Sequence, residues 1–215
     1  MAKGLVAYLV FWLAVFALCA QTPAATWRCG YERWAVKTGQ DATAKMVTKA
    51  GDATIALLTH EQSPLPKQTG KYPPQINHRL TGEFSIVTLR VTITAYRVEN
   101  DSDLHLIMSD GVSTMIGEIP CECCMANLIG KSGMAASPWV NKVRVVRYQF
   151  LSKTGYVPAP WTTAYGPPFI KCNIPAKITG VVFFDWPHKQ PGAAAGNAVE
   201  LHPILHIFYY KHALP

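Results

Sequence analysis

The sequence predicts a mainly β protein: a five-stranded OB-like barrel with one helix between its third and fourth strands and an N-terminal arm. Three observations lead to this prediction. Five segments alternate hydrophobic and polar residues, turn residues separate most of them, and one stretch with helical spacing follows the third segment. Strand, strand, strand, helix, strand, strand is the order of elements in the OB-fold, a Greek-key barrel. Another small antiparallel barrel or a sandwich is the alternative.

The first three predicted strands follow one another closely. From Phe84 to Tyr96, Val, Leu and Ile alternate with Thr and Arg, which indicates a long strand with one buried face. The segment ENDSD then provides a turn, because Asn and Asp tolerate turn geometry and bond to neighbouring amides. The second strand, Leu104 to Ser109, ends in the turn SDG, and the third strand runs from Thr114 to Ile119.

A helix and two further strands complete the predicted barrel. Ser137 and Pro138 are typical of an N-cap and a first helical residue, and Gly155 can end a helix in a left-handed conformation. The stretch YVPAPWTTAYGPPF that follows is too rich in proline for regular structure and predicts a long loop. The fourth and fifth strands are expected at Ile178 to Trp186 and at Val199 to Tyr209.

Residues 1–25 have the pattern of a secretory signal peptide. One Lys precedes an uncharged hydrophobic run from Gly4 to Ala20, and the small residues of Thr22 to Ala25 fit a cleavage site. The alternative is an uncleaved anchor, because the run is just below the length that spans a bilayer comfortably. We therefore expect a secreted or periplasmic protein, attached to a membrane only if this segment is retained.

The rest of the chain divides into two parts. Residues 26–80 form an N-terminal arm and a Pro-rich connector, with a short helix around Thr54 to His60, and residues 81–215 form the OB-like domain. The formal net charge is +7, but the basic residues are scattered and form no dense run. This charge permits attraction to nucleic acid or anionic glycans without specifying either.

Of the six cysteines, one lies in the signal segment and five remain: Cys29, Cys121, Cys123, Cys124 and Cys172. Outside the cytoplasm they should oxidise, and two bridges with one spare thiol allow about fifteen arrangements. The motif CECC has the spacing of a zinc or redox motif, but a zinc site would need a second such pair. We predict structural disulfides that link the cluster at 121–124 to Cys29 and Cys172.

The fifth predicted strand carries an unusual set of side chains. Glu200, His202 and His206 share one face, and the preceding hairpin adds Asp185 and His188. Ligands two residues apart on a strand point the same way, and His with carboxylate suits zinc or another divalent metal. The metal candidates are thus His188, Glu200, His202 and Asp185. The alternative is that these side chains are hydrated on the outer face of the strand.

Asp103 and His105 also share a face, on the second predicted strand. In an OB-like barrel the third strand separates the second from the fifth, so we expect about 10 Å between these backbones and those of Glu200 and His202. We therefore predict no ion shared by all four residues, and we interpret Asp103 and His105 as exposed to solvent.

Two further groups are candidates for ligand binding. Arg33 and Lys37 could bind an anion beside Trp34 as a stacking surface, or Trp34 could pin the arm while Glu32 and Arg33 pair with each other. In the Pro-rich loop, Trp161 and Tyr165 could line a ligand groove or anchor the loop itself; these two aromatic residues complete the set of ligand-binding candidates.

Several motifs resemble a widespread family of secreted bacterial proteins whose biochemical role is not established. They are ERWAVKTGQDA, DLHLIMSDG, MIGEIP and GVVFFDWPHKQPG with NAVELHPILHI. The resemblance covers most of the chain after the signal segment and implies no catalytic residues. The expected fold is also similar to that of secreted thermonuclease-like enzymes, but the turn from Asn100 to Asp103 lacks the Thr of their calcium-binding turn.

We therefore expect an extracytoplasmic OB-like binding module for a polar or anionic ligand, with an oligonucleotide, a glycan or a protein partner as the candidates. The alternative is a metal-dependent hydrolase, such as a phosphodiesterase or nuclease, with His188, Glu200 and His202 at its centre and Asp185 assisting. A third hypothesis is an envelope protein whose arm and loop only mediate assembly. No Ser-His-Asp motif or phosphate-cradling Gly-rich loop stands out in the sequence.

Overall fold

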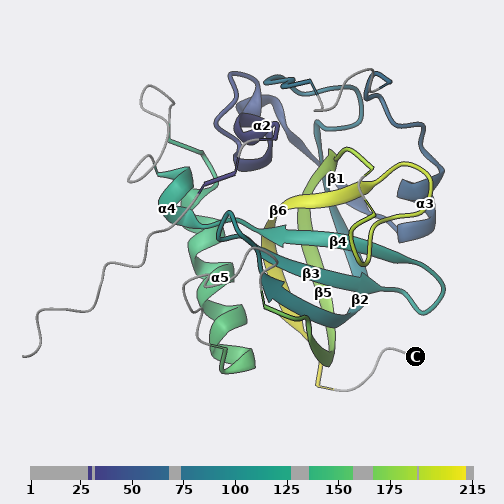
Figure 1. The fold of residues 1–215 in the computed structure, drawn as a ribbon, viewed down its shortest axis with the longest axis vertical. Helices are drawn as coiled ribbons and strands as arrows, with labels where there is room; N and C mark the ends of the chain where they lie inside the picture. The colour runs from purple at the N-terminus through teal and green to yellow at the C-terminus, as the bar shows by residue number, and fades with distance from the viewer. Residues whose placement is uncertain are drawn as a thin grey trace, which may run out of the picture.

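One six-stranded sheet dominates the fold, with the strand order β1-β2-β3-β4-β6-β5 (Figure 1). Because β2 also pairs with β5, five of the strands close into a ring. The predicted mainly β class is confirmed. The computed structural model describes residues 29–30, 32–67, 74–126, 136–156, 167–187 and 189–211.

The elements have the following bounds. The strands are β1 (Thr48–Asp52), β2 (Ser85–Val98), β3 (Leu104–Ser109), β4 (Thr114–Ile119), β5 (Ile170–Phe184) and β6 (Val199–Tyr209). The helices are α2 (Trp34–Thr38), the short 3-10 helix η1 (Ala44–Met46), α3 (Ile55–His60), α4 (Glu122–Met125) and α5 (Val140–Thr154). None of the helices in the described ranges is long and apolar enough to cross a membrane.

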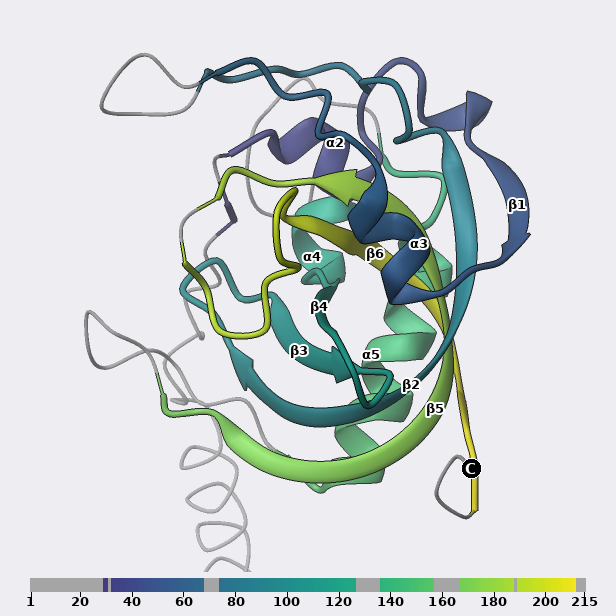
Figure 2. The same cartoon turned by 90° about the vertical axis from the view of Figure 1, so that its right-hand side faces the viewer.

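The two longest strands hold the ring together. β2 and β5 pair antiparallel from Ile86 with Val181 to Tyr96 with Ile170, and Figure 2 shows them curving side by side around the ring. The prediction placed the start of the fourth strand at Ile178, but β5 begins at Ile170. The sequence did not indicate this half of the strand, because it contains Pro175, and proline has no backbone N–H to donate to a neighbouring strand. Its carbonyl still accepts a hydrogen bond from the Tyr210 N–H.

The ring closes through β4 and β6, which run parallel over only two register pairs, Ile116 with Glu200 and Gly117 with Leu201. A Cβ atom at Gly117 would lie 2.9 Å from Ile204 Cδ1, so any larger residue here would require neighbouring side chains to shift. The β4–β6 seam, as we call this pairing, is therefore short and tight.

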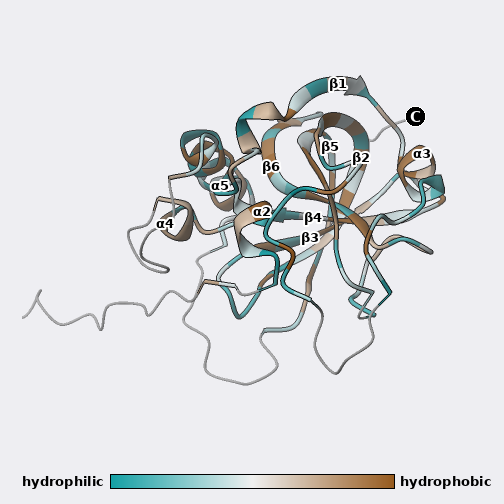
Figure 3. Ribbon diagram, turned by 90° about the horizontal axis from the view of Figure 1, so that it is seen from above, coloured by the Kyte–Doolittle hydropathy of each residue, from teal (hydrophilic) through white to brown (hydrophobic). Residues whose placement is uncertain are grey.

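Helix α5 packs on the ring, as the sequence predicts. Val143, Val146 and Phe150 are buried, and the rings of Phe150 and Tyr96 meet edge to face with 5.1 Å between centroids. Gly155 ends the helix with a φ of 65°, as expected for a left-handed C-cap. Figure 3 shows hydrophobic residues along the ring strands and both hydrophobic and hydrophilic residues on α5, as expected for a helix with one covered face.

The sequence predicts α3 but not α2 or β1. Thr54 caps α3 by accepting a hydrogen bond from the Leu57 N–H, which is the expected N-cap chemistry. The segment TKAGD of β1 is mostly exposed and lacks hydrophobic alternation, so its parallel pairing with β2 left no signal in the sequence.

A buried ion pair fixes the arm to the ring. Arg33 donates to both carboxylate oxygens of Glu83, at 2.5 and 2.7 Å, and to the Phe184 carbonyl at 2.9 Å, and neither charged side chain is exposed. The expected pairing of Glu32 with Arg33 is therefore wrong. A second buried pair, Arg79 with Asp41 at 3.0 Å, also joins the arm to the segment before β2.

The Arg33–Glu83 pair gives a test of this attachment. Glu83→Gln would leave the Arg33 guanidinium buried without its counter-ion, and we expect a loss of about 3–5 kcal/mol in the free energy of unfolding. Guanidinium denaturation measures the change, with Glu61→Gln at an exposed carboxylate as the control. A loss below about 1 kcal/mol in Glu83→Gln would show that the pair does not hold the arm.

Candidate functional site

A group of buried ionisable side chains lies where β3, β4 and β6 meet. It comprises Glu99, Asp103, His105, Glu118, Glu200 and His202, which we call the buried cluster. All except Glu99 are at most 3% exposed. Because charged groups are rarely buried without compensation, so dense a set marks the candidate functional site.

His202 lies at the centre of the buried cluster. Its Nδ1 is 3.0 Å from Glu118 Oε2 and 3.5 Å from Glu200 Oε1, while its Nε2 is 3.5 Å from Asp103 Oδ2. Neither ring nitrogen makes an aligned hydrogen bond, and neither do Asp103 Oδ2 and Glu200 Oε1. One imidazole thus faces three carboxylates through ion-pair contacts.

His105 contacts the other side of Glu118. Its Nδ1 lies 3.4 Å from Glu118 Oε1 and 3.2 Å from Glu99 Oε1, and its Nε2 is 3.1 Å from the carbonyl of Pro191. Arg97 also donates to Glu99 Oε1, at 2.6 and 3.1 Å. Glu118 therefore presents one oxygen to each imidazole of the buried cluster.

These contacts shift the pKa values of the cluster. Burial alone would raise the pKa of Glu118, but His202 and His105 hold it well below its usual range. Burial would lower the pKa of His105, yet Glu118 and Glu99 raise it to about 10, and three carboxylates raise that of His202 well above its ordinary value. Burial and the charge of Glu118 raise the pKa of Glu200 to about 7. The carboxylates thus favour the protonated, positively charged form of both imidazoles.

A pocket opens beside the buried cluster. We call it the acidic pocket; its cavity has a volume of about 550 Å³, and its lining is Cys29, Gly30, Glu32, Trp34, Lys37, Glu99, Asn100, Asp101, Asp185 and Gln190. Among the described lining residues, four carboxylates stand against the one ammonium of Lys37, which lies 3.5 Å from Asp185 Oδ2. Glu99 belongs to both the pocket and the buried cluster.

The structure brings together part of the predicted metal set. Glu200 and His202 converge, whereas Asp185 pairs with Lys37, and His188 lies outside the described residues. Glu200 and His202 are buried, so the alternative of hydrated outer side chains is wrong for them. Helices α2 and α5 both pack against β6. They cover side chains that the alternation of hydrophobic and polar residues predicted to be exposed. His206, beyond this cover, is exposed.

The expectation for Asp103 and His105 is also wrong. Both are fully buried, and Asp103 Oδ2 lies 3.5 Å from His202 Nε2 although one strand separates their backbones. Glu118, on the strand between them, contacts the same imidazole at Nδ1. Glu118 itself was missed; its only signal is a carboxylate in MIGEIP, a segment that otherwise reads as a buried strand.

The predicted ligand-binding residues separate into three groups. Arg33 is bound to Glu83 and does not line the acidic pocket, so its predicted use as an anion-binding residue is not supported. Trp34 and Lys37 do line the pocket. Trp161 and Tyr165 lie outside the described residues.

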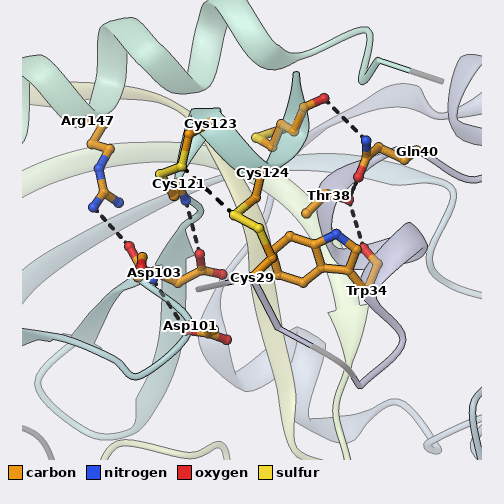
Figure 4. Close-up of a disulfide and its surroundings, with 12 residues drawn as sticks. Cys29, Trp34, Thr38, Gln40, Asp101, Asp103, Cys121, Cys123, Cys124 and Arg147 are labelled. Carbon is orange, nitrogen blue, oxygen red and sulfur yellow. Dashed lines mark hydrogen bonds between the residues drawn. A yellow bond between two sulfur atoms is a disulfide. The ribbon is translucent and has the colours of Figure 1, made fainter. Parts of the chain in front are cut away.

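Two disulfides pack beside the pocket, Cys29–Cys124 and Cys121–Cys123 (Figure 4). The predicted link from the cysteine cluster to Cys29 is confirmed, but the link to Cys172 is wrong. Cys172 lies on β5, where its thiol donates to the Ile93 carbonyl of β2. The two bridges are those expected of a protein from an oxidising compartment.

The disulfides also support the site directly. Trp34 packs against the cysteine cluster, and the Cys121 N–H donates to Asp103 Oδ1 at 3.0 Å (Figure 4). Cys29 itself lines the acidic pocket. The bridge from Cys29 to Cys124 therefore ties one wall of the pocket to the segment that orients Asp103.

Comparisons with protein-family models, with curated proteins and with solved structures gave no match to this chain. The fold and the site therefore carry the functional argument.

Cys172 gives a test of the cysteine assignment. Burial raises the pKa of its thiol to about 11 from an ordinary 9.0, so the reactive thiolate at pH 8 should be about a hundredfold scarcer than for an ordinary thiol. Alkylation by iodoacetamide, located by peptide mass, should be slow at pH 8 in the native protein and should accelerate about tenfold per pH unit toward pH 10. Equal rates in the native and the guanidinium-unfolded protein at pH 8 would contradict this assignment.

Proposed function

We propose that the protein is an extracytoplasmic OB-like binding module and that the acidic pocket is its ligand site. A closed ring of five strands with α5 between β4 and β5 supports the OB-like assignment. OB-folds bind ligands with the loops that join strands 1 to 2 and strands 4 to 5. In this ring these loops join β2 to β3 and β5 to β6.

The position of the acidic pocket carries the proposal. Glu99, Asn100 and Asp101 come from the β2–β3 loop, and Asp185 and Gln190 come from the β5–β6 loop. The arm closes the third side with residues of α2 and the segment before it. This position matches that of the ligand sites of OB-folds and so supports the proposal. The volume of the pocket suits a small ligand or one residue of a longer one.

The charge of the pocket narrows the class of ligand. Among the described lining residues the four carboxylates outnumber the ammonium of Lys37, even though Lys37 pairs with Asp185 and Arg97 pairs with Glu99. The lining would therefore repel the phosphates of an oligonucleotide. A ligand that carries ammonium or guanidinium groups fits this lining better than an anion does. Of the partners considered, a polar compound or a protein segment with positive charge is the one we propose.

The described residues favour this module over a metal-dependent hydrolase. A catalytic zinc keeps one coordination position open to substrate. Asp103, Glu118 and His202 are at most 3% exposed, so an ion among them would be enclosed rather than open. The two disulfides support an extracytoplasmic location for the module.

Binding of spermidine, a small polyamine, tests the proposal. Calorimetry should show binding that weakens as salt rises, because salt screens the attraction between the ammonium groups and the carboxylates. Glu32→Gln and Asp185→Asn should each lower the affinity by about threefold to tenfold, since each removes one charge from the lining. The matched control, Glu61→Gln, removes an exposed carboxylate that does not line the pocket and should change nothing.

A single-stranded thymidine oligonucleotide provides the opposing probe. We expect no binding at a salt concentration where spermidine binds. Tighter binding of the oligonucleotide than of spermidine, strengthened by Glu32→Gln, would overturn the proposed ligand class. The absence of any effect of both pocket variants on spermidine binding would overturn the proposed site.

A further inference from the structure

We propose that Asp103, Glu118 and His202 bind one divalent transition-metal ion, of the zinc class, that joins β3, β4 and β6 and closes the ring. This site lies behind the acidic pocket and does not depend on the function proposed for it. The ion would have a structural use, because the three side chains are enclosed.

The place of the three residues in the sheet is the first observation. The last register pair of the β4–β6 seam is Gly117 with Leu201, so Glu118 and His202 are the next residues along both strands. Pro203 follows and has no N–H to continue a ladder. The contact between the side chains of Glu118 and His202 therefore begins where the backbone pairing ends. Asp103 lies directly before β3, so it brings a side chain from a third strand to this contact.

The spacing of the polar atoms is the second observation. Zinc binds His nitrogen and carboxylate oxygen at about 2.0–2.2 Å, so two ligands at a tetrahedral angle lie about 3.4 Å apart. Glu118 Oε2 lies 3.0 Å from His202 Nδ1, and Asp103 Oδ2 lies 3.5 Å from His202 Nε2; neither contact is an aligned hydrogen bond. One ligand atom from each residue lies within 4.8 Å of those of the other two. One nitrogen of His202 would bind the ion, and a side-chain shift would bring the carboxylate that now contacts the other nitrogen onto the same ion.

The charge of the cluster is the third observation. His202 faces the carboxylates of Asp103, Glu118 and Glu200, and one imidazole can carry only a single positive charge. A divalent ion would displace the proton from one nitrogen of His202, so its binding would add one net positive charge among these carboxylates, and it would also use the unaligned oxygen of Asp103. Glu200 Oε1, which also lacks a hydrogen bond, is a further carboxylate oxygen that can complete the coordination.

The surroundings hold the three ligands in place. The Cys121 N–H binds Asp103 Oδ1 and leaves Oδ2 toward His202. His105 faces the second oxygen of Glu118 and is itself held at the Pro191 carbonyl. Metal-binding carboxylates are commonly oriented by such outer contacts. One imidazole with two carboxylates suits zinc or manganese better than calcium, which prefers oxygen ligands alone.

Metal binding to the purified, oxidised protein tests the inference. After removal of metal with a chelator, calorimetric titration with Zn²⁺ should show one equivalent bound and the melting temperature should rise. His202→Gln and Glu118→Gln should each lower the affinity at least about tenfold. His206→Gln, at an exposed histidine of the same strand, is the matched control and should bind as the unaltered protein does.

Cobalt substitution locates the ion independently of stability. The absorption spectrum of bound Co²⁺ should show nitrogen and oxygen ligands only. A thiolate charge-transfer band would place the metal at Cys172, whose thiol is not in a disulfide, and would overturn the inference. Should His202→Gln fail to fold, Asp103→Asn provides the same comparison at another strand.

Two outcomes separate this inference from the proposed function. Glu32→Gln should weaken spermidine binding and leave Zn²⁺ binding unchanged. His202→Gln, where it folds, should weaken Zn²⁺ binding and leave spermidine binding unchanged. Absence of stoichiometric Zn²⁺, Mn²⁺ and Co²⁺ binding would overturn the metal site alone. Equal Zn²⁺ affinity in Glu118→Gln and in the unaltered protein would do so as well.

Discussion

Closure of the ring at the β4–β6 seam is the constraint on which the remaining structure depends. The other strand pairs of the ring run over six or more register pairs, whereas β4 and β6 share two. Glu118 and His202 make contact just beyond the β4–β6 seam, and Asp103, directly before β3, also contacts His202. Interactions among ionisable side chains thus take over where backbone hydrogen bonds stop. Such contacts are strong only while they remain shielded from water.

The β4–β6 seam also explains the position of the acidic pocket. Glu99 belongs to both the pocket and the buried cluster, and the β2–β3 loop, the β5–β6 loop and the arm hold the remaining carboxylates of the lining. The disulfide between Cys29 and Cys124 covers this region, and the buried pair of Arg33 with Glu83 fixes the arm that forms the third wall. Pocket and ring closure are therefore parts of one charged region. A ligand with positive charge would add to the compensation that the imidazoles already provide.

The ring strands could be predicted because each buries one face and so alternates hydrophobic and polar residues. Where that signal fails, the prediction failed: β1 is an exposed edge, and Pro175 interrupts β5. At the site, the spacing of Glu200 and His202 on one strand was sufficient to find them. Glu118 and Asp103 could not be placed with them, because their meeting depends on the parallel register of β4 with β6. A sequence does not specify such a register when the pairing is short.

A double-mutant cycle between Glu118 and His202 tests the central claim, that their contact holds the ring closed. The free energy of unfolding is measured for the unaltered protein, for Glu118→Gln, for His202→Gln and for the double variant, all in the presence of a chelator. The account predicts that each single variant is less stable and that the two changes are coupled by about 1–3 kcal/mol. Additive effects within about 0.3 kcal/mol, or a single variant more stable than the unaltered protein, would contradict it.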